Sequence, residues 1–300
     1  MRSVTIAQWG QIHSLYLPIY IADRKGFFAK NGLKLNLTLA GNDDQTFLEV
    51  AKGRADFGLG DPSFCAMAAN KSVNAKVVAT IVNRTGVWGI SRSPVISEIT
   101  HPQDLVNLRI GSLPAPATTY ALIQNLKNTN RRLLRSMKII QAPIGEQFSL
   151  LAKGEVDVAL DIEPYVSIAE SKGYNVIYSL AGLHGRYTFT GLYTRQDLIE
   201  KNPNTVAAVV AAIDAALKLL NKDLTVAEEI SAELFPELDQ KVIKNSLKRL
   251  RKAQVWRNTA ETEESAWLNS ISVRSGIGDK FVKDALAHID NSFVPTHTER

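Results

Sequence analysis

The chain has 300 residues, of which 45% are hydrophobic and 22% are charged, and its formal net charge is +5. This composition is typical of a globular protein and excludes disordered and fibrous classes. The longest uninterrupted apolar run, Val206 to Ile213, is far shorter than the ~20 residues of a membrane-spanning helix, so no membrane span is expected. The single cysteine, Cys65, excludes an internal disulfide framework and a multi-cysteine metal site.

The N-terminal part of the chain alternates between predicted strands and helices. A helix starts near Pro18, and a shorter one around 47–51 ends at Gly53, because glycine adopts the left-handed cap conformation without steric cost. Three buried strands are expected in this part, at 4–7, 33–37 and 55–59.

A diverged copy of this unit follows at a constant offset of 101 residues, from 51 to 152. Four residues keep this offset: Ala51, Lys52, Gly53 and Asp56 recur as Ala152, Lys153, Gly154 and Asp157. Strands of the second unit are expected at 108–111, 137–140 and 156–160. Alternating strands and helices indicate a parallel sheet with helices on its faces, so the repeat predicts two similar α/β lobes.

The lobes are predicted at 1–88 and 89–190, and the remainder of the chain, 191–300, is expected to be mostly helical. The predicted helices of this last part lie at 205–220, 226–234, 239–252, 261–270 and 279–289.

The segment LYLPIYIADRKGFFAKNGLKLNL (15–37) resembles the opening of the nitrate/sulfonate/taurine-type substrate-binding proteins of ABC transporters. The same superfamily includes thiamine-pyrimidine-precursor binders and pyrimidine synthases. Segments that resemble this family follow in the family's order at 50–68, 103–126, 150–164 and 203–223. The resemblance implies a type II periplasmic-binding-protein fold, in which two parallel-sheet α/β lobes, joined by a two-strand hinge, close on a ligand. It also implies that the C-terminal helices complete the first lobe, and that the chain crosses between lobes near 86–92 and 186–193.

The ligand cleft of such a fold is expected beyond the carboxyl ends of the strands. The first lobe would contribute Gln8, Trp9, Gln11, His13, Asn42, Asp43, Asp61 and Ser63. The hinge would contribute Thr85, Trp88 and Tyr187, and the second lobe Pro116, Thr118, Thr119, Asp161 and Glu163.

Several of these residues also have a purely structural interpretation. Trp9 is either a stacking platform for a flat ligand or a core residue at a strand end. Asp61 precedes Pro62 and is therefore a candidate helix cap, which is compatible with a ligand contact. His13 can be a loop residue that bonds to the backbone, and Trp88 can pack within the hinge.

The acidic character of the cleft loops bears on the ligand. They carry Asp43, Asp44, Asp61, Asp161 and Glu163 but no Lys or Arg, and carboxylates repel a free anion. An aminopyrimidine-like or other vitamin-like heterocycle is therefore favoured over a sulfonate, nitrate or taurine, which remain the alternative.

The sequence predicts the solute-binding component of an ABC importer that delivers a small polar molecule to a permease. A ligand sensor and a pyrimidine-synthase-like enzyme are the alternatives. No enzyme, cofactor or metal is expected, because no Walker loop, zinc signature or cysteine-rich motif is present. No nucleic acid is expected to bind, since no aromatic residues interleave with the basic stretches near 131–135 and 248–252.

The expected form is a monomer that is periplasmic, or extracellular and tethered to a membrane. No apolar signal-peptide region follows Arg2, so the export signal would have been removed, and a cytoplasmic protein is the alternative.

Overall fold

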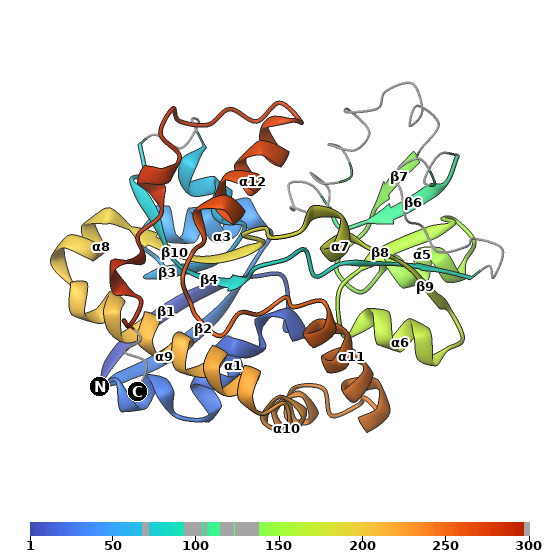
Figure 1. The fold of residues 1–300 in the computed structure, drawn as a ribbon, viewed down its shortest axis with the longest axis horizontal. Coiled ribbons are helices and arrows are strands. Elements are labelled where there is room, and N and C mark those ends of the chain that lie inside the picture. The colour runs from blue at the N-terminus through green and yellow to red at the C-terminus, as the bar shows by residue number, and fades with distance from the viewer. Residues whose placement is uncertain (68–71, 93–103, 105–106, 115–122, 124–137, 297–300) are drawn as a thin grey trace.

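The computed structural model describes residues 1–67, 72–92, 104, 107–114, 123 and 138–296. Its strands form two five-stranded sheets that lie side by side (Figure 1). The first sheet has the order β2-β1-β3-β10-β4, with strands β1 (Arg2–Trp9), β2 (Leu33–Gly41), β3 (Phe57–Gly60), β4 (Ala75–Val82) and β10 (Thr190–Arg195). The second has the order β7-β6-β8-β5-β9, with β5 (Trp88–Ser91), β6 (Arg109–Ser112), β7 (Lys138–Gln141), β8 (Val158–Asp161) and β9 (Asn175–Ser179).

Both sheets are mostly parallel, as the alternating strands and helices predict. β1 pairs in parallel with β2 and β3, and β6 pairs in parallel with β7 and β8. Each sheet also contains one antiparallel strand that the sequence did not predict: β10 between β3 and β4, and β5 between β8 and β9. These are the strands that the chain enters directly after crossing from the other sheet.

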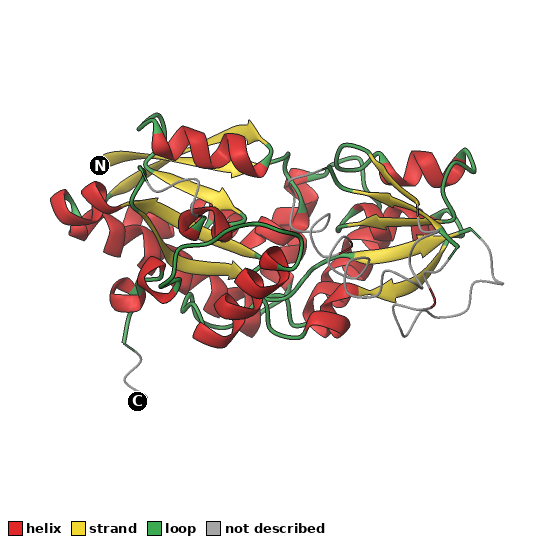
Figure 2. Cartoon of the chain, turned by 90° about the horizontal axis from the view of Figure 1, so that it is seen from above, coloured by secondary structure: helices red, strands yellow, loops and turns green. Residues whose placement is uncertain are grey.

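The chain crosses between the sheets twice. Residues 83–87 lead from β4 to β5, and residues 185–189 lead back from α7 (Leu180–His184) to β10. Figure 2 shows the sheets at opposite ends of the molecule, with helices packed around each. The two segments pass between these ends, which places them where a hinge would bend.

The helices complete this arrangement. Around the first sheet lie α1 (Leu17–Arg24), α2 (Phe27–Lys30), α3 (Asp43–Ala51), α8 (Gln196–Lys201), α9 (Pro203–Lys222), α10 (Thr225–Leu234) and α12 (Glu264–Ser275). Around the second lie α5 (Gln147–Ala152), α6 (Tyr165–Ser171) and α7, while α11 (Gln240–Lys252) contacts α6 as well as α10. The apolar spacing of α11 buries Val242, Ile243, Leu247 and Leu250.

Among the described residues, α9 is the one helix that is long and apolar enough, by composition alone, to cross a membrane. It packs against α1 and α2, and 56% of its apolar stretch is buried within the protein. Its Asp214 is 1% exposed and accepts a hydrogen bond from the Ala260 amide at 2.9 Å. These are the contacts of a core helix in a globular protein.

The helix predicted at 279–289 does not form. This segment is mostly irregular, with isolated β-bridges at Phe281 and Ile289 and one 3-10 turn at Leu286–His288. Ile289 forms a β-bridge with Val77, and the Asp290 amide donates to the Val77 carbonyl at 2.8 Å. Val77 lies on β4, an edge strand, and an edge strand offers unpaired backbone groups that favour extended neighbours over a helix.

Candidate functional site

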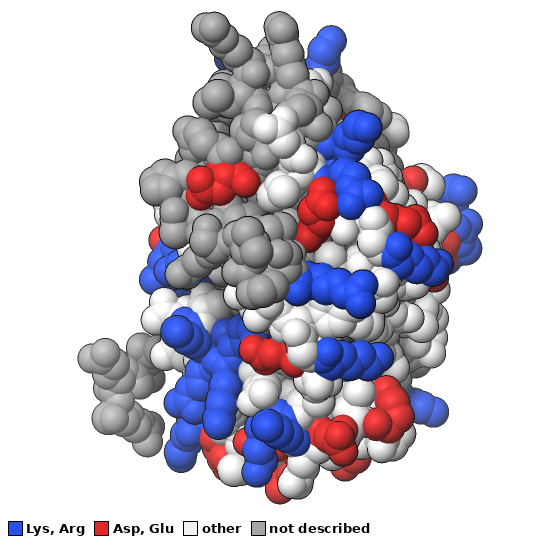
Figure 3. Space-filling view, turned by 90° about the vertical axis from the view of Figure 1, so that its right-hand side faces the viewer, with Lys and Arg blue, Asp and Glu red and all other residues white. Residues whose placement is uncertain are grey.

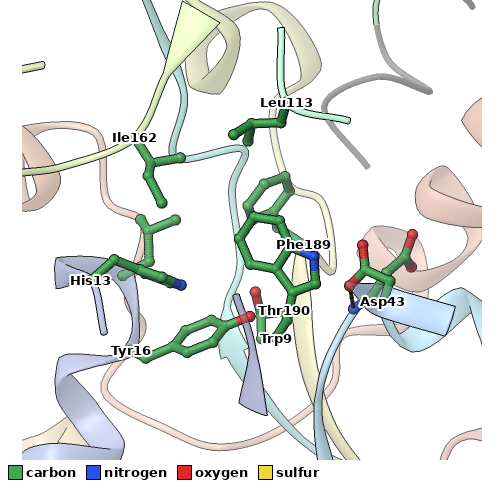
Figure 4. A pocket seen from close by; sticks show the side chains of 10 residues that line it. Trp9, His13, Tyr16, Asp43, Leu113, Ile162, Phe189 and Thr190 are labelled. Carbon is green, nitrogen blue, oxygen red and sulfur yellow. Dashed lines mark hydrogen bonds between the residues drawn. The ribbon is translucent and has the colours of Figure 1, made fainter. Parts of the chain in front are cut away.

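A pocket of about 330 Å³ lies between the two lobes, at the carboxyl ends of strands from both sheets (Figure 4). Its lining residues are Trp9, His13, Leu15, Tyr16, Asp43, Asp61, Leu113, Ile162, Phe189 and Thr190. The first lobe supplies both acids and three of the rings, from the ends of β1 and β3, the segment after β1 and the start of α3, while the ring of Phe189 comes from the second crossing segment. The second lobe supplies Leu113 and Ile162, which follow β6 and β8. The pocket therefore lies at the sheet edge that the fold predicts for a ligand.

Aromatic rings form much of the pocket wall. Figure 4 shows Trp9, His13, Tyr16 and Phe189 around a common space. The rings of Trp9 and His13 meet edge to face with centroids 5.8 Å apart, and those of His13 and Tyr16 are tilted at 4.1 Å. The Tyr16 hydroxyl points toward that of Thr190. Such a wall presents large, rigid apolar faces together with a few polar tips, which suits a flat ligand.

His13 is fully buried in this wall. Neither of its ring nitrogens has a hydrogen-bond partner among the residues that the structure describes, so the predicted bond to the backbone is not seen. Burial lowers the pKa of His13 to about 3. The ring is therefore neutral at pH 7, and one nitrogen can donate a hydrogen bond while the other accepts one.

Two buried acids, Asp43 and Asp61, also line the pocket and contact each other there. Asp43 Oδ1 accepts a hydrogen bond from the Asp61 amide at 2.8 Å. Asp61 Oδ1 accepts one from the Ser63 amide at 2.9 Å, which confirms that Asp61 is a cap. Burial and the neighbouring Asp61 raise the pKa of Asp43 to about 8. Asp43 is thus a neutral carboxyl at pH 7 and can donate as well as accept.

Arg274, which the sequence analysis did not identify, neutralises Asp61. It lies in α12, and its Nη1 donates to Asp61 Oδ2 at 2.9 Å, while its Nε donates to Asp279 at 2.6 Å. The guanidinium also lies 5.5 Å from the Phe64 ring centroid. Both partners of the Asp61–Arg274 pair are only about 3% exposed, so the charge of Asp61 is balanced by Arg274 rather than by solvent. The pocket is therefore close to neutral.

The acids predicted for the second lobe do not line this pocket. Asp161 is fully buried at the end of β8, where its Oδ1 accepts the Ile162 amide at 2.8 Å and burial raises its pKa to about 8. Glu163 is also fully buried, and its carboxylate accepts hydrogen bonds from Arg249 of α11 and from the Ser167 hydroxyl. This ion pair ties the second lobe to the C-terminal helices.

The polar residues predicted at the rim mostly hold loops in place. Gln8 is buried, accepts from the Tyr20 hydroxyl at 2.8 Å and donates to the Gln11 carbonyl at 2.8 Å. Gln11 Nε2 donates to the Tyr165 hydroxyl of the second lobe at 2.5 Å. Asn42 caps α3 by accepting from an amide of its first turn. The contact from Gln11 shows that the two lobes touch at the pocket.

The remaining predicted residues are divided between several environments. The hydroxyls of Ser63 and Thr85 are buried and have no hydrogen-bond partner among the described residues. Tyr187 is buried and packs against Phe189 at a ring distance of 6.4 Å. Trp88 lines a different cavity, beside the first crossing segment. Three predicted residues lie outside the described residues: Pro116, Thr118 and Thr119.

Two mostly parallel α/β lobes, joined by two crossing segments around a central pocket, define the type II periplasmic-binding-protein fold. The family model described as NMT1/THI5-like matches residues 14–223, which is more than half of the chain, and the chain belongs to that family. The predicted fold and family resemblance are thereby confirmed.

Similar proteins include YtlA of Bacillus subtilis (strain 168), which is a binding protein by name. It is 24% identical over 277 residues, covering 88% of this chain and 81% of the relative. A ligand-binding component of an ABC-type import system from Staphylococcus aureus, solved with zinc bound, is similar with a TM-score of 0.73, 14% identity and coverage of 98% of both chains. The aliphatic sulphonate binding protein SsuA of Escherichia coli has a TM-score of 0.74 and 16% identity, covering 100% of this chain and 94% of that chain.

The fold also occurs in an enzyme. The desulfurization enzyme DszB is similar with a TM-score of 0.63 and 13% identity, over 92% of both chains. Within the part of the chain that the structure describes, no three His, Cys, Asp or Glu residues lie close enough together to hold a metal ion.

Proposed function

We propose that this protein is the solute-binding component of an ABC importer, and that it captures a flat, amine-bearing heterocycle of the aminopyrimidine kind. The observation that carries the proposal is the pocket between the lobes. It combines aromatic walls with the buried carboxyl of Asp43, and among the described residues the one cation beside it, Arg274, is already engaged by Asp61. A pocket of this kind favours a flat, uncharged or weakly basic ligand.

Each wall has a role in this recognition. Trp9 and Tyr16 offer faces on which a planar ring can stack or edges against which it can pack. The neutral Asp43 carboxyl can accept a hydrogen bond from an exocyclic amine and donate one to a ring nitrogen. The neutral His13 ring supplies one further donor and one acceptor. Leu113 and Ile162 cover the ligand from the second lobe when the lobes close.

The proposed mechanism is capture followed by closure. Only the closed form contacts the ligand from both lobes, so ligand binding shifts the population toward that form. The expected partner is an ABC permease, which fits the similarity to the import component of Staphylococcus aureus. On the same basis we place the monomeric protein in the periplasm, or outside the cell on a membrane tether.

The test is to identify the ligand directly. Small molecules released from the denatured, freshly purified protein would be examined by mass spectrometry. A thermal-shift panel would then compare thiamine precursors and other vitamin-like heterocycles with taurine, alkanesulfonates and nitrate. We expect stabilisation by a heterocycle, and its loss in the variant Trp9→Leu. Stabilisation by a sulfonate or nitrate, with none by any heterocycle, would refute the proposed ligand class.

A sulfonate or nitrate binder on the same fold is the second candidate. The similarity to SsuA favours it, as does the buried Ser63 hydroxyl, which has no partner among the described residues and could donate to an oxyanion. The described pocket offers no unengaged cation for such an anion, which is why this candidate ranks second. The same thermal-shift panel separates the two candidates.

We do not assign an enzymatic activity. Cys65, the single cysteine, is buried beside the pocket without lining it, and burial raises the pKa of its thiol, so it is not poised as a nucleophile. A sensor that signals to a regulator would use the same pocket and closure. It would be distinguished by the partner that the purified closed form binds.

A further inference from the structure

A groove with about 1880 Å³ of empty space, much larger than the 330 Å³ of the solute pocket, lies on another part of the molecule. Its walls come from four parts: Glu170 of α6, residues 176–182 of the second lobe, residues 245–254 of α11 and its end, and Arg84 with Trp88 at the first crossing segment. A second cavity, with about 1150 Å³ of empty space, adjoins it and shares Arg84 and Gln254. No residue lines both this groove and the solute pocket.

The groove and the adjoining cavity, which we call the hinge groove, are strongly basic. Their lining includes Arg84, Arg186, Lys248, Arg249, Arg251, Lys252 and Arg257, whereas Glu170 is the one acidic residue among the described residues that line them. Three of the seven cations are engaged by carboxylates: Arg249 by Glu163 and Glu170, and Arg186 and Arg257 by Glu263.

The other four cations of the hinge groove are not engaged. Arg84, Lys248, Arg251 and Lys252 form no ion pair with any residue that the structure describes. Figure 3 shows one face of the molecule, on which acidic and basic side chains lie next to one another at the right and bottom and basic ones gather at the lower left. Like charges that are close together in one groove repel one another, so an anion bound there would reduce the electrostatic repulsion between these cations.

We propose that the hinge groove binds a soluble polyphosphate-type anion, a small molecule with two or more phosphate groups. A concave basic surface focuses its field on a bound anion more than a flat one does. Guanidinium and ammonium donors are the groups that bind phosphate oxygens, through a planar fork in arginine and a point charge in lysine. Small-molecule sites are concave, as the hinge groove is, whereas protein interfaces are usually flatter.

Such an anion would also act on the lobes. It would bridge α11, the first crossing segment and the β9–α7 wall, which belong to different lobes. The groove has its shape in an arrangement where the lobes touch through Gln11 and Tyr165. An anion that fits this shape stabilises the closed arrangement, and by linkage the closed arrangement binds the anion more tightly.

The test is calorimetric titration of the full chain with sodium tripolyphosphate at low salt, with orthophosphate as the single-phosphate comparison. We expect tripolyphosphate to bind, orthophosphate to bind more weakly, and added salt to weaken both. The triple variant Arg84→Gln/Lys248→Gln/Lys252→Gln should bind tripolyphosphate at least about tenfold more weakly, because three charge-assisted contacts are removed.

The matched control removes the same charge elsewhere. Lys34→Gln/Lys52→Gln/Lys153→Gln changes three exposed lysines that lie outside the groove and form no ion pair among the described residues. The affinity of this control variant for tripolyphosphate should stay within about twofold of that of the unmodified protein, since distant surface charges are screened. Circular dichroism melts would show that both variants fold.

Four results would overturn the proposal. They are an absence of tripolyphosphate binding at low salt, an equal loss of affinity in the two triple variants, binding of a poly-glutamate peptide but not of tripolyphosphate, and binding only to vesicles that contain phosphatidylglycerol. The last two would assign the groove to an acidic protein segment or a membrane surface instead. None of these outcomes bears on the ligand of the solute pocket.

Discussion

The two lobes have the same scaffold but differ where their strands end. In the first lobe, Asp56 accepts a hydrogen bond from the Thr5 amide at 2.8 Å, and in the second Asp157 accepts one from the Arg109 amide at 2.8 Å. The glycines that end the preceding helices, Gly53 and Gly154, have φ of 71° and 73°. The repeated residues therefore hold equivalent strands together in both lobes.

Beyond these strands the lobes differ. Asp61 of the first lobe caps a 3-10 helix and pairs with Arg274, whereas Asp161 of the second lobe lies buried behind the pocket. The first lobe contributes rings and acids to the pocket, and the second contributes aliphatic side chains. A duplicated scaffold thus preserves the residues that join strands, while the residues at the strand ends diverge to form an asymmetric site.

The largest effect should come from removing the cation of the first lobe. Arg274→Met leaves the Asp61 carboxylate buried without that partner, which should lower the free energy of unfolding by about 3–5 kcal/mol. This exceeds the roughly 1 kcal/mol expected from a cap alone. Urea denaturation followed by circular dichroism would measure it. Adding Asp61→Asn should restore much of the loss, and a loss below about 1 kcal/mol in Arg274→Met would contradict the assigned role of the pair.

The buried acid of the second lobe should make stability depend on pH. The pKa of Asp161 is about 8 in the folded protein, against an ordinary value of 3.8. At pH values between these two, Asp161 is therefore protonated in the folded state and ionised in the unfolded state. Stability therefore falls as pH rises through this window, and Asp161→Asn should reduce that fall by about 1–2 kcal/mol between pH 6.5 and 8. Protonation of His13 changes stability in the opposite direction, because its pKa is lowered on folding. That change falls mainly below pH 6.5 and therefore outside this window. Urea denaturation at both pH values would measure the difference. Equal pH dependence in both proteins would show that Asp161 ionises freely.

The asymmetry of the pocket predicts unequal effects on ligand binding. Trp9→Leu should weaken binding of the heterocycle identified in the thermal-shift panel by about tenfold, because a stacking face is lost. Ile162→Ala in the opposite lobe should weaken binding by only about threefold, since this substitution removes only an aliphatic contact. Calorimetric titration would measure both. A larger effect of Ile162→Ala would mean that the second lobe dominates recognition.

The smallest effect should appear in the equivalent scaffold residues. Asp56→Asn and Asp157→Asn weaken the same backbone contact, but Asp157 also pairs with the Arg109 guanidinium, which lowers the pKa of Asp157. That ion pair is partly exposed, so Asp157→Asn should cost only about 0.5–1 kcal/mol more than Asp56→Asn. Paired urea denaturation curves measure the difference. A greater cost at Asp56 would show that the two positions are not equivalent.

Much of the fold could be predicted from the sequence because its signals are local. Apolar runs mark β1, β2, β6 and β7, and Gly53 and Gly154 end helices in the conformation that glycine alone adopts readily. For the same reason the sequence predicts Trp9, His13, Asp43 and Asp61 at the cleft, since they end strands or lie just after them, and all four line the pocket. The order of parallel strands fixes which loops meet, so these positions follow from topology.

Other features depended on contacts between distant parts of the chain. Arg274 meets Asp61 across 213 residues, and Arg249 meets Glu163 across 86, so neither pair has a local sequence signal. The segment 279–289 has residues compatible with a helix, but it is irregular and its end bridges β4 through Ile289. The neutrality of Asp43 likewise depends on burial by several elements at once. Local sequence determined the elements and their ends, whereas tertiary packing determined which charges were neutralised, because desolvation and ion pairing depend on neighbours that only the folded chain brings together.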